Sequence, residues 1–134
     1  MFNLRIKYLS FFFGLITILS FFNVVYSYYL NLYLNINTYY ISLISSLIIA
    51  LVFYKFEIQK IKTSIFDKIL TVFFGYLSLP LILCLPFYFS IYNLTFLNAY
   101  FESVSGFTST GFTIFENIKH IDQSLILWRS SIQW

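Results

Sequence analysis

The chain has 134 residues, of which 60% are hydrophobic and only 10% are charged, and its formal net charge is +3. Soluble domains carry about 25% charged residues, so this composition excludes a water-exposed globular surface and predicts an all-α integral membrane protein. Residues 8–54 and 69–101 contain no Asp, Glu, Lys, Arg or His. Because a bilayer-spanning helix takes about 20 apolar residues, the first run has room for two crossings and the second for one crossing plus a remainder.

The basic residues are distributed asymmetrically along the chain. Six of the eight Lys and Arg lie before the first predicted span or between the second and the third, and residues 31–38 contain none. Cytoplasmic loops are enriched in such residues, so the N-terminus and residues 54–68 are predicted to be cytoplasmic in a multi-pass protein of the cell inner membrane. Few lysines, flanked by apolar spans, argue against nucleic acid as a partner and favour the lipid bilayer. The six residues are Arg5, Lys7, Lys55, Lys60, Lys62 and Lys68.

Three transmembrane helices are predicted in chain order, at residues 9–29, 39–54 and 69–91. Asparagines and tyrosines fill the gap between the first two, which disfavours one continuous helix and is typical of a membrane–water interface. The third span contains Gly75, Pro80 and Pro86. Membrane helices tolerate proline where a neighbouring group satisfies the carbonyl that the ring leaves free, so we expect a kinked crossing here.

A shorter helix is predicted next, at residues 95–106, with Thr95 as its N-cap and Asn98 as a competing cap. Apolar residues follow at three- and four-residue spacing, but the segment is too short to cross a bilayer. It is either a surface helix or the descending part of a re-entrant pore loop. A further apolar helix begins near Ser124, and we interpret it as the start of a fourth helix across the membrane.

The residues between these two helices include Thr108, Ser109, Thr110 and Gly111, which we call the filter segment. A potassium ion is held by neutral oxygen ligands that replace its water, and backbone carbonyls in fixed geometry suit this task. Glycine permits backbone angles that other residues resist, and hydroxyl side chains add oxygens. The C-terminal end of the preceding helix, near Gly106, directs its negative dipole towards the same place.

The motif FESVSGFTSTGFT, followed by LILWRSSIQW, resembles the first pore repeat of the Trk/Ktr/HKT superfamily of potassium transporters, and specifically its TrkH-type members. The resemblance implies four repeats of helix, pore loop and helix around one pore, preceded by two extra helices. Residues 1–67 then hold the two extra helices and a cytoplasmic loop, and residues 68–134 hold a truncated first repeat. It also implies potassium uptake through a backbone-carbonyl filter, by a homodimer with a cytosolic nucleotide-binding regulatory subunit. Because the chain has one pore loop where the family has four, we expect an N-terminal fragment that ends after the first pore loop.

Candidate site residues follow from the resemblance by position. Thr108, Ser109, Thr110 and Gly111 match the potassium-binding filter, and Gly111 matches the glycine that the family associates with potassium selectivity. Ser109 stands where threonine is frequent, and Phe112 stands where a small residue is common. We expect the ring of Phe112 to point into protein and to support the filter.

Other polar residues near the filter segment have simpler interpretations. Glu102 is expected to be a structural anchor that accepts hydrogen bonds from loop amides, in preference to a functional carboxylate. Arg129, beside Trp128, is expected to be an anchor at the membrane interface, and Glu116 and His120 are expected to be solvated. The sequence contains no nucleotide-binding loop, catalytic triad or acid pair, so we expect neither an enzyme nor a cofactor, and no metal site beyond potassium.

An alternative hypothesis is a small multi-pass membrane protein that has a structural or assembly role and transports nothing. The predicted spans fit this hypothesis equally well. It does not explain why a polar loop with a glycine follows a short helix after the third span.

The predicted topology can be tested by labelling single cysteines from outside the cell. We expect positions 33–37 to react and positions 57–62 to be protected, because the basic residues keep the second region in the cytoplasm. The reverse pattern would contradict the topology and, with it, entry of the loop from the outer face.

Overall fold

The computed structural model describes residues 6–55, 65–116 and 120–133, and the regular elements in these ranges are helices. Three stretches are long and apolar enough to span a membrane, as predicted, and the third ends at Tyr88 instead of residue 91. The third helix begins at Ile65, before the predicted domain boundary at residue 68. The helices are α1 (Ile6–Tyr29), α2 (Ile36–Lys55), α3 (Ile65–Leu83), α4 (Leu85–Tyr88), α5 (Phe96–Phe107) and α6 (Gln123–Gln133).

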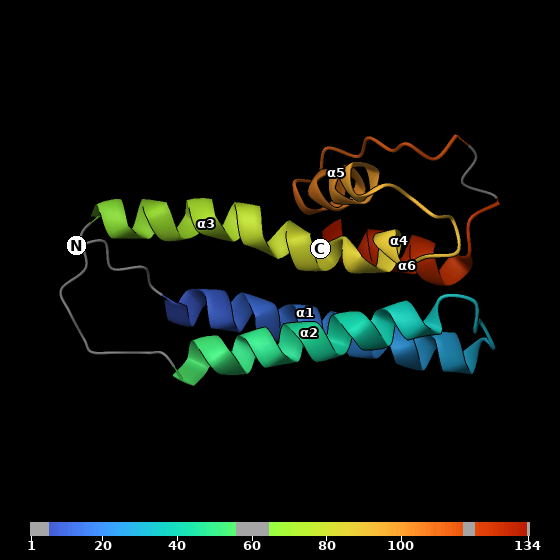
Figure 1. Cartoon of the computed structure of the whole chain (residues 1–134), viewed down its shortest axis with the longest axis horizontal. Helices are drawn as coiled ribbons and strands as arrows, with labels where there is room; N and C mark the ends of the chain where they lie inside the picture. The colour runs from blue at the N-terminus through green and yellow to red at the C-terminus, as the bar shows by residue number, and fades with distance from the viewer. Residues whose placement is uncertain (1–5, 56–64, 117–119, 134) are drawn as a thin grey trace.

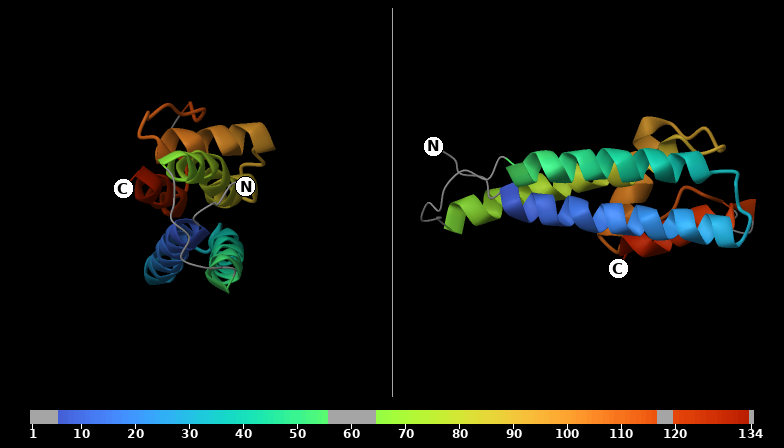
Figure 2. Two further views of the ribbon diagram at one scale, coloured as in Figure 1. Left: turned by 90° about the vertical axis from the view of Figure 1, so that its left-hand side faces the viewer. Right: turned by 90° about the horizontal axis from the view of Figure 1, so that it is seen from below.

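The long helices lie side by side, and the short ones gather at one end of them. α1 and α2 form an antiparallel hairpin, and α3 with α4 runs alongside it (Figure 1). α6 lies between this hairpin and α5, and α5 crosses the direction of the long helices instead of running parallel to them (Figure 2). The hairpin therefore supports one side of the segment formed by α3 to α6.

A row of small side chains on α2 holds the hairpin together. Thr38, Ser42, Ser46 and Ala50 recur at every fourth position, and all of them are buried. Their size lets two helices approach closely, which increases van der Waals contact where lipid is as apolar as the helix surface. Ser10 Oγ of α1 also donates a hydrogen bond to the carbonyl oxygen of Ala50 at 2.8 Å.

The opposite faces of α1 and α2 carry large apolar side chains. Phe11, Phe22, Ile44 and Ile48 are each more than half exposed. Helices that are apolar on every side are typical of segments inside a membrane, because lipid takes the place of a protein neighbour. These faces are therefore suited to contact with lipid.

The third span is divided into α3 and α4 where its two prolines fall. Pro80 lies inside α3 and Pro86 lies in the first turn of α4, so the backbone ladder lacks their N–H donors. Side chains from other helices bind two carbonyl groups nearby. Trp128 Nε1 donates to the Leu83 oxygen at 3.1 Å, and Ser103 Oγ donates to the Pro80 oxygen at 3.0 Å. The span is interrupted at Cys84, between the two prolines, and α5 and α6 each donate a hydrogen bond to a carbonyl group beside the interruption.

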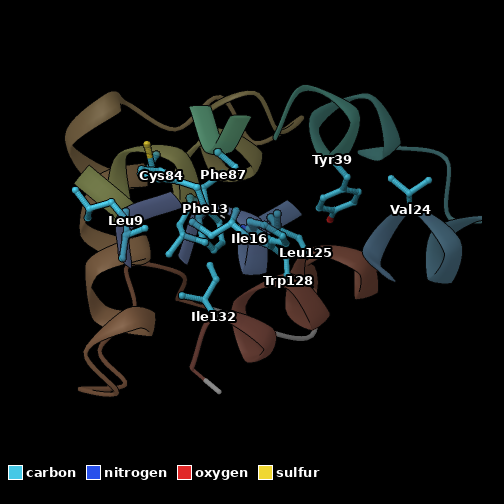
Figure 3. Close-up of a cluster of buried hydrophobic side chains, with 14 residues drawn as sticks. Leu9, Phe13, Ile16, Val24, Tyr39, Cys84, Phe87, Leu125, Trp128 and Ile132 are labelled. Carbon is cyan, nitrogen blue, oxygen red and sulfur yellow. Dashed lines mark hydrogen bonds between the residues drawn. The ribbon is translucent and has the colours of Figure 1, made fainter. Parts of the chain in front are cut away.

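The buried apolar core includes facing side chains of α1 and α6 (Figure 3). Leu125, Trp128 and Ile132 lie on one face of α6 at helical spacing, and they gather close to Phe13 and Ile16 of α1. Trp128 is fully buried. Truncating a buried aromatic residue of this size typically costs about 3–5 kcal/mol, so Trp128 fixes α6 against the rest of the bundle.

The hairpin packing predicts the effect of a larger side chain on α2. Ser42 is fully buried, so we expect Ser42→Leu to separate the helices and lower the free energy of unfolding by about 1–3 kcal/mol. Ser45 is only partly buried, which makes Ser45→Leu the matched control. Thermal unfolding of the purified protein in detergent measures both, and equal effects would contradict the close packing.

Candidate functional site

Helix α5 extends from the end of the third span to its middle. Thr95 caps the helix, as predicted, because its side chain accepts a hydrogen bond from the Asn98 amide. The ring of Phe96, the first residue of α5, lies 6.2 Å from that of Tyr88. The last residue, Phe107, lies 5.3 Å from Tyr76. These contacts set the depth at which the filter segment begins.

The chain then returns towards the end where α5 began. The ring of Phe115 lies 6.0 Å from that of Tyr92, which follows the third span. The amide of Asp122 donates to Tyr92 Oη at 2.6 Å. The segment before α6 therefore enters and leaves the bundle at the same end. Glu116 and His120, on the way back, are exposed as predicted.

Two residues of the filter segment adopt left-handed backbone angles. The φ angle is +56° at Ser109 and +79° at Gly111. Glycine takes this conformation at little cost, whereas a β-branched residue rarely does. Threonine is frequent at position 109 in the family that the motif resembles. Serine, which is not β-branched, therefore suits the left-handed backbone at this point better than threonine does.

Hydrogen bonds to Ser105 and Val104 tie the filter segment to the end of α5. The Ser105 carbonyl oxygen accepts from the Thr110 amide at 3.1 Å and from Thr110 Oγ1 at 3.2 Å. Thr108 Oγ1 donates to the Val104 carbonyl oxygen at 2.8 Å. The threonine hydroxyls are thus engaged with the helix, which leaves the backbone of the segment as its most available source of oxygen ligands.

The carbonyl groups along the loop fall into two sets. Those of Thr108, Ser109 and Thr110 belong to exposed residues and accept no hydrogen bond from the part of the chain that the structure describes. Those of Gly111 and Phe112 both accept from Arg129 Nη2, at 3.3 Å and 2.8 Å. The four predicted filter residues lie together, but their carbonyls are in different environments.

Glu102 lies behind the loop as a fully buried carboxylate. Its Oε1 accepts from Thr113 Oγ1 at 2.7 Å and from the Ile114 amide at 2.6 Å. Its Oε2 accepts from Arg129 Nε at 2.9 Å, which makes an ion pair between a fully buried carboxylate and a partly exposed arginine. The hydrogen bond from a loop amide that we expected is present. A carboxylate in this position costs free energy unless it is paired and hydrogen-bonded, and both conditions are met.

The environment of Arg129 differs from the interfacial anchor that we expected. The guanidinium bridges Glu102 and the carbonyls of Gly111 and Phe112, so it connects α6, α5 and the loop. The sequence contains a signal for this pairing. Glu102 is the only charged residue of α5, and Arg129 is the only charged residue of α6. Two charges in otherwise uncharged apolar helices are natural partners.

The ring of Phe112 is 71% exposed, so the expectation that it points into protein is wrong for the residues that the structure describes. The backbone explains the outward direction. The Phe112 carbonyl oxygen accepts from Ser105 Oγ at 2.6 Å and from Arg129 Nη2, so it faces the interior while the side chain faces outwards. The contribution of Phe112 to the loop is therefore made by its main chain.

A second polar network, at the other end of α6, was not predicted. The nearly buried Asp122 accepts from Asn35 Nδ2 at 2.8 Å and from Ser124 Oγ at 2.6 Å. Asn35 Oδ1 accepts from the Ile91 amide at 3.1 Å. Tyr39 Oη donates to Ser124 Oγ at 2.9 Å. These contacts join the start of α2, the segment after α4 and the start of α6.

Parts of known transporters are similar to this chain. Over 60 residues this chain is 44% identical to the Trk system potassium uptake protein TrkI of Halomonas elongata. The matched stretch makes up 45% of this chain and 11% of that protein. Over 50 residues it is 38% identical to an uncharacterized cation transporter of Methanocaldococcus jannaschii. This second stretch makes up 37% of this chain and 10% of that protein. The matches span about a tenth of the length of these relatives. No protein-family model matches the chain, and no solved structure is significantly similar to it.

The ion pair behind the loop predicts the effect of removing the cation. Arg129→Leu leaves the fully buried Glu102 without its partner, so we expect it to lower the free energy of unfolding by about 3–5 kcal/mol. Adding Glu102→Gln removes the uncompensated charge and should restore part of this loss. Chemical unfolding in detergent measures the free energy of unfolding of the two single variants and of the double variant. Lys55→Leu is the control for loss of an exposed charge. Strictly additive effects of the two substitutions would contradict the pairing.

Proposed function

We propose that this chain contributes a potassium-binding pore loop to a Trk-type transporter of the cell inner membrane, with its N-terminus in the cytoplasm. The observation that carries the proposal is the set of exposed carbonyl groups at Thr108, Ser109 and Thr110, which accept no hydrogen bond from the described residues. The partial similarity to Trk-type cation transporters supports the same conclusion.

The chemistry of the filter segment suits a potassium ion. Neutral carbonyl oxygens can replace the ion's hydration shell and still let it leave. The segment begins at the C-terminal end of α5, where the helix dipole adds partial negative charge. Arg129 binds the next two carbonyls and fixes the backbone beyond the segment. An ion passes such a loop without a chemical step, so the proposal needs no catalytic residue and no cofactor.

In the proposed arrangement, α5 is a re-entrant helix that enters the membrane from the outer face. Its end lies against Tyr76, at the middle of the third span, and the return passes Tyr92 beyond the end of that span. α6 is then the first part of a fourth crossing. Backbone outside helices occurs at membrane depth only where protein buries it or where it lines a water-filled cavity, and a pore meets the second condition.

One loop supplies only part of the oxygen ligands around an ion, so the proposal requires further pore loops beside this one. Large apolar side chains on α5 and on the loop after it are exposed and available for contact with these further pore loops. The most exposed are Leu97 at 76% and Phe112 at 71%. A homodimer with a cytosolic nucleotide-binding regulatory subunit belongs to the same proposal and rests on the family resemblance.

The filter glycine provides the test of this function. In a Trk-type chimera that carries residues 95–134 of this chain as its first pore loop, we expect Gly111→Ser to weaken discrimination against sodium. An added Cβ at Gly111 meets no atom within 4 Å, so the change acts through the left-handed backbone angle and not through a clash. That angle costs a non-glycine residue about 1–2 kcal/mol, which shifts the loop away from the carbonyl geometry that replaces the hydration shell of the larger ion. A cost of about 1 kcal/mol that falls on the rubidium-bound loop alone lowers the ratio of rubidium to sodium uptake about fivefold.

Thr113→Ser is the matched control, because it keeps the hydroxyl that donates to Glu102 at 2.7 Å. Uptake of rubidium in competition with sodium is measured for both variants at equal expression. If Thr113→Ser alters selectivity and Gly111→Ser does not, the filter lies on other residues.

A further inference from the structure

A groove lies between α1 and α3, and one end of it reaches Phe107, the residue directly before the filter segment. Its volume is about 490 Å³, within the range of about 300–1,000 Å³ that is typical of small-molecule sites. Leu9 and Phe12 of α1 line one side, and Val72 and Leu79 of α3 line the other. At Gly75 the two helices come close, since an added Cβ would lie 3.5 Å from Leu9 Cδ2. The groove is therefore narrow, apolar and part of two membrane-spanning helices.

One end of the groove has a different chemistry. Among the described residues that line the groove, Lys68 is the charged one, and it lies near the start of α3, one turn before Thr71. The lysine is exposed and makes no ion pair with another residue that the structure describes. It also belongs to the part of the chain where most of the basic residues are gathered. A positive charge at the end of an apolar groove is complementary to an anion that carries a long apolar tail.

The length of the groove matches one leaflet of a bilayer. Lys68 and Leu79 are eleven positions apart on α3, which is about 16 Å at a rise of 1.5 Å per residue. Half of a hydrocarbon core of about 30 Å is about 15 Å, the depth that one acyl chain covers from its headgroup to the midplane. The apolar end of the groove is formed by Leu79 and by Phe107, the last residue of α5.

We propose that this groove holds one acyl chain of an anionic phospholipid, whose phosphate binds the Lys68 ammonium group. The acyl chain lies on the floor formed by Gly75 and Leu9 and ends against Phe107. An apolar helix of another protein could also cover such a surface, but it would leave the lysine without a counter-charge. The proposal is independent of ion transport, although its occupant touches the residue directly before the filter segment.

Photolabelling of the full chain in mixed detergent–lipid micelles tests the site. The probes are a phosphatidylglycerol and a phosphatidylcholine that carry the same acyl chain with a terminal diazirine, and labelled residues are mapped by mass spectrometry. We expect labels to concentrate at Phe12, Leu79 and Phe107. Labelling by phosphatidylglycerol should exceed labelling by phosphatidylcholine about fivefold, because the attraction of one lysine to an anionic lipid changes the binding constant by about that factor. Labels spread evenly over the exposed apolar faces of α1 to α3 would overturn the proposal.

Three variants separate the two parts of the site. Lys68→Glu should abolish the preference for phosphatidylglycerol, whereas Lys55→Glu, at the end of α2 and outside the groove, should keep it. Gly75→Leu fills the floor and should reduce labelling by both lipids. Equal losses from the two lysine variants would mean bulk attraction of anionic lipid and would overturn the site. Groove residues that stay unlabelled in the wild type, while exposed faces react, would indicate a protein occupant instead.

Discussion

The Glu102–Arg129 ion pair holds together three segments that are far apart in the sequence. The carboxylate comes from α5, the guanidinium from α6, and the loop between them is bound by both. Arginine suits this position because its planar group presents several donors in fixed directions, so it reaches a carboxylate and two carbonyls at once. A lysine would keep the charge but could not span the same acceptors. The shape of the loop therefore depends on where α6 lies relative to α5.

The position of α6 depends in turn on the hairpin. Trp128 is buried close to Phe13 and Ile16 of α1, and Tyr39 of α2 donates to Ser124 in the first turn of α6. The small side chains of α2 keep α1 and α2 close enough to present one continuous surface. Support thus passes from the hairpin to α6, from α6 through Arg129 to the loop, and from the loop back to α5. The hairpin contributes to the site without supplying any residue to it.

Local patterns predicted much of this architecture. The uncharged runs gave the number of spans, because hydropathy in a membrane depends on composition and not on which residues meet. The cap at Thr95 and the interruption of the helix between Pro80 and Pro86 also follow from neighbours in sequence. The contacts of Arg129 and of Asp122 were missed because each joins residues from different helices, and a single sequence does not state which helices pack together. The outward ring of Phe112 was missed for a related reason, since its direction is set by hydrogen bonds to its own backbone.

The two ends of the bundle are held by different kinds of contact. At the end near Asn35, hydrogen bonds through Asp122 and Ile91 link three segments, and these polar contacts are short and directional. At the other end, the groove separates parts of α1 and α3. The return segment meets the bundle at Asp122, within this polar network, because the Asp122 amide also donates to Tyr92 Oη at 2.6 Å. The path of the loop is therefore anchored at the end where directional polar contacts join the segments, and the groove at the other end lies between apolar surfaces that place no such constraint on it.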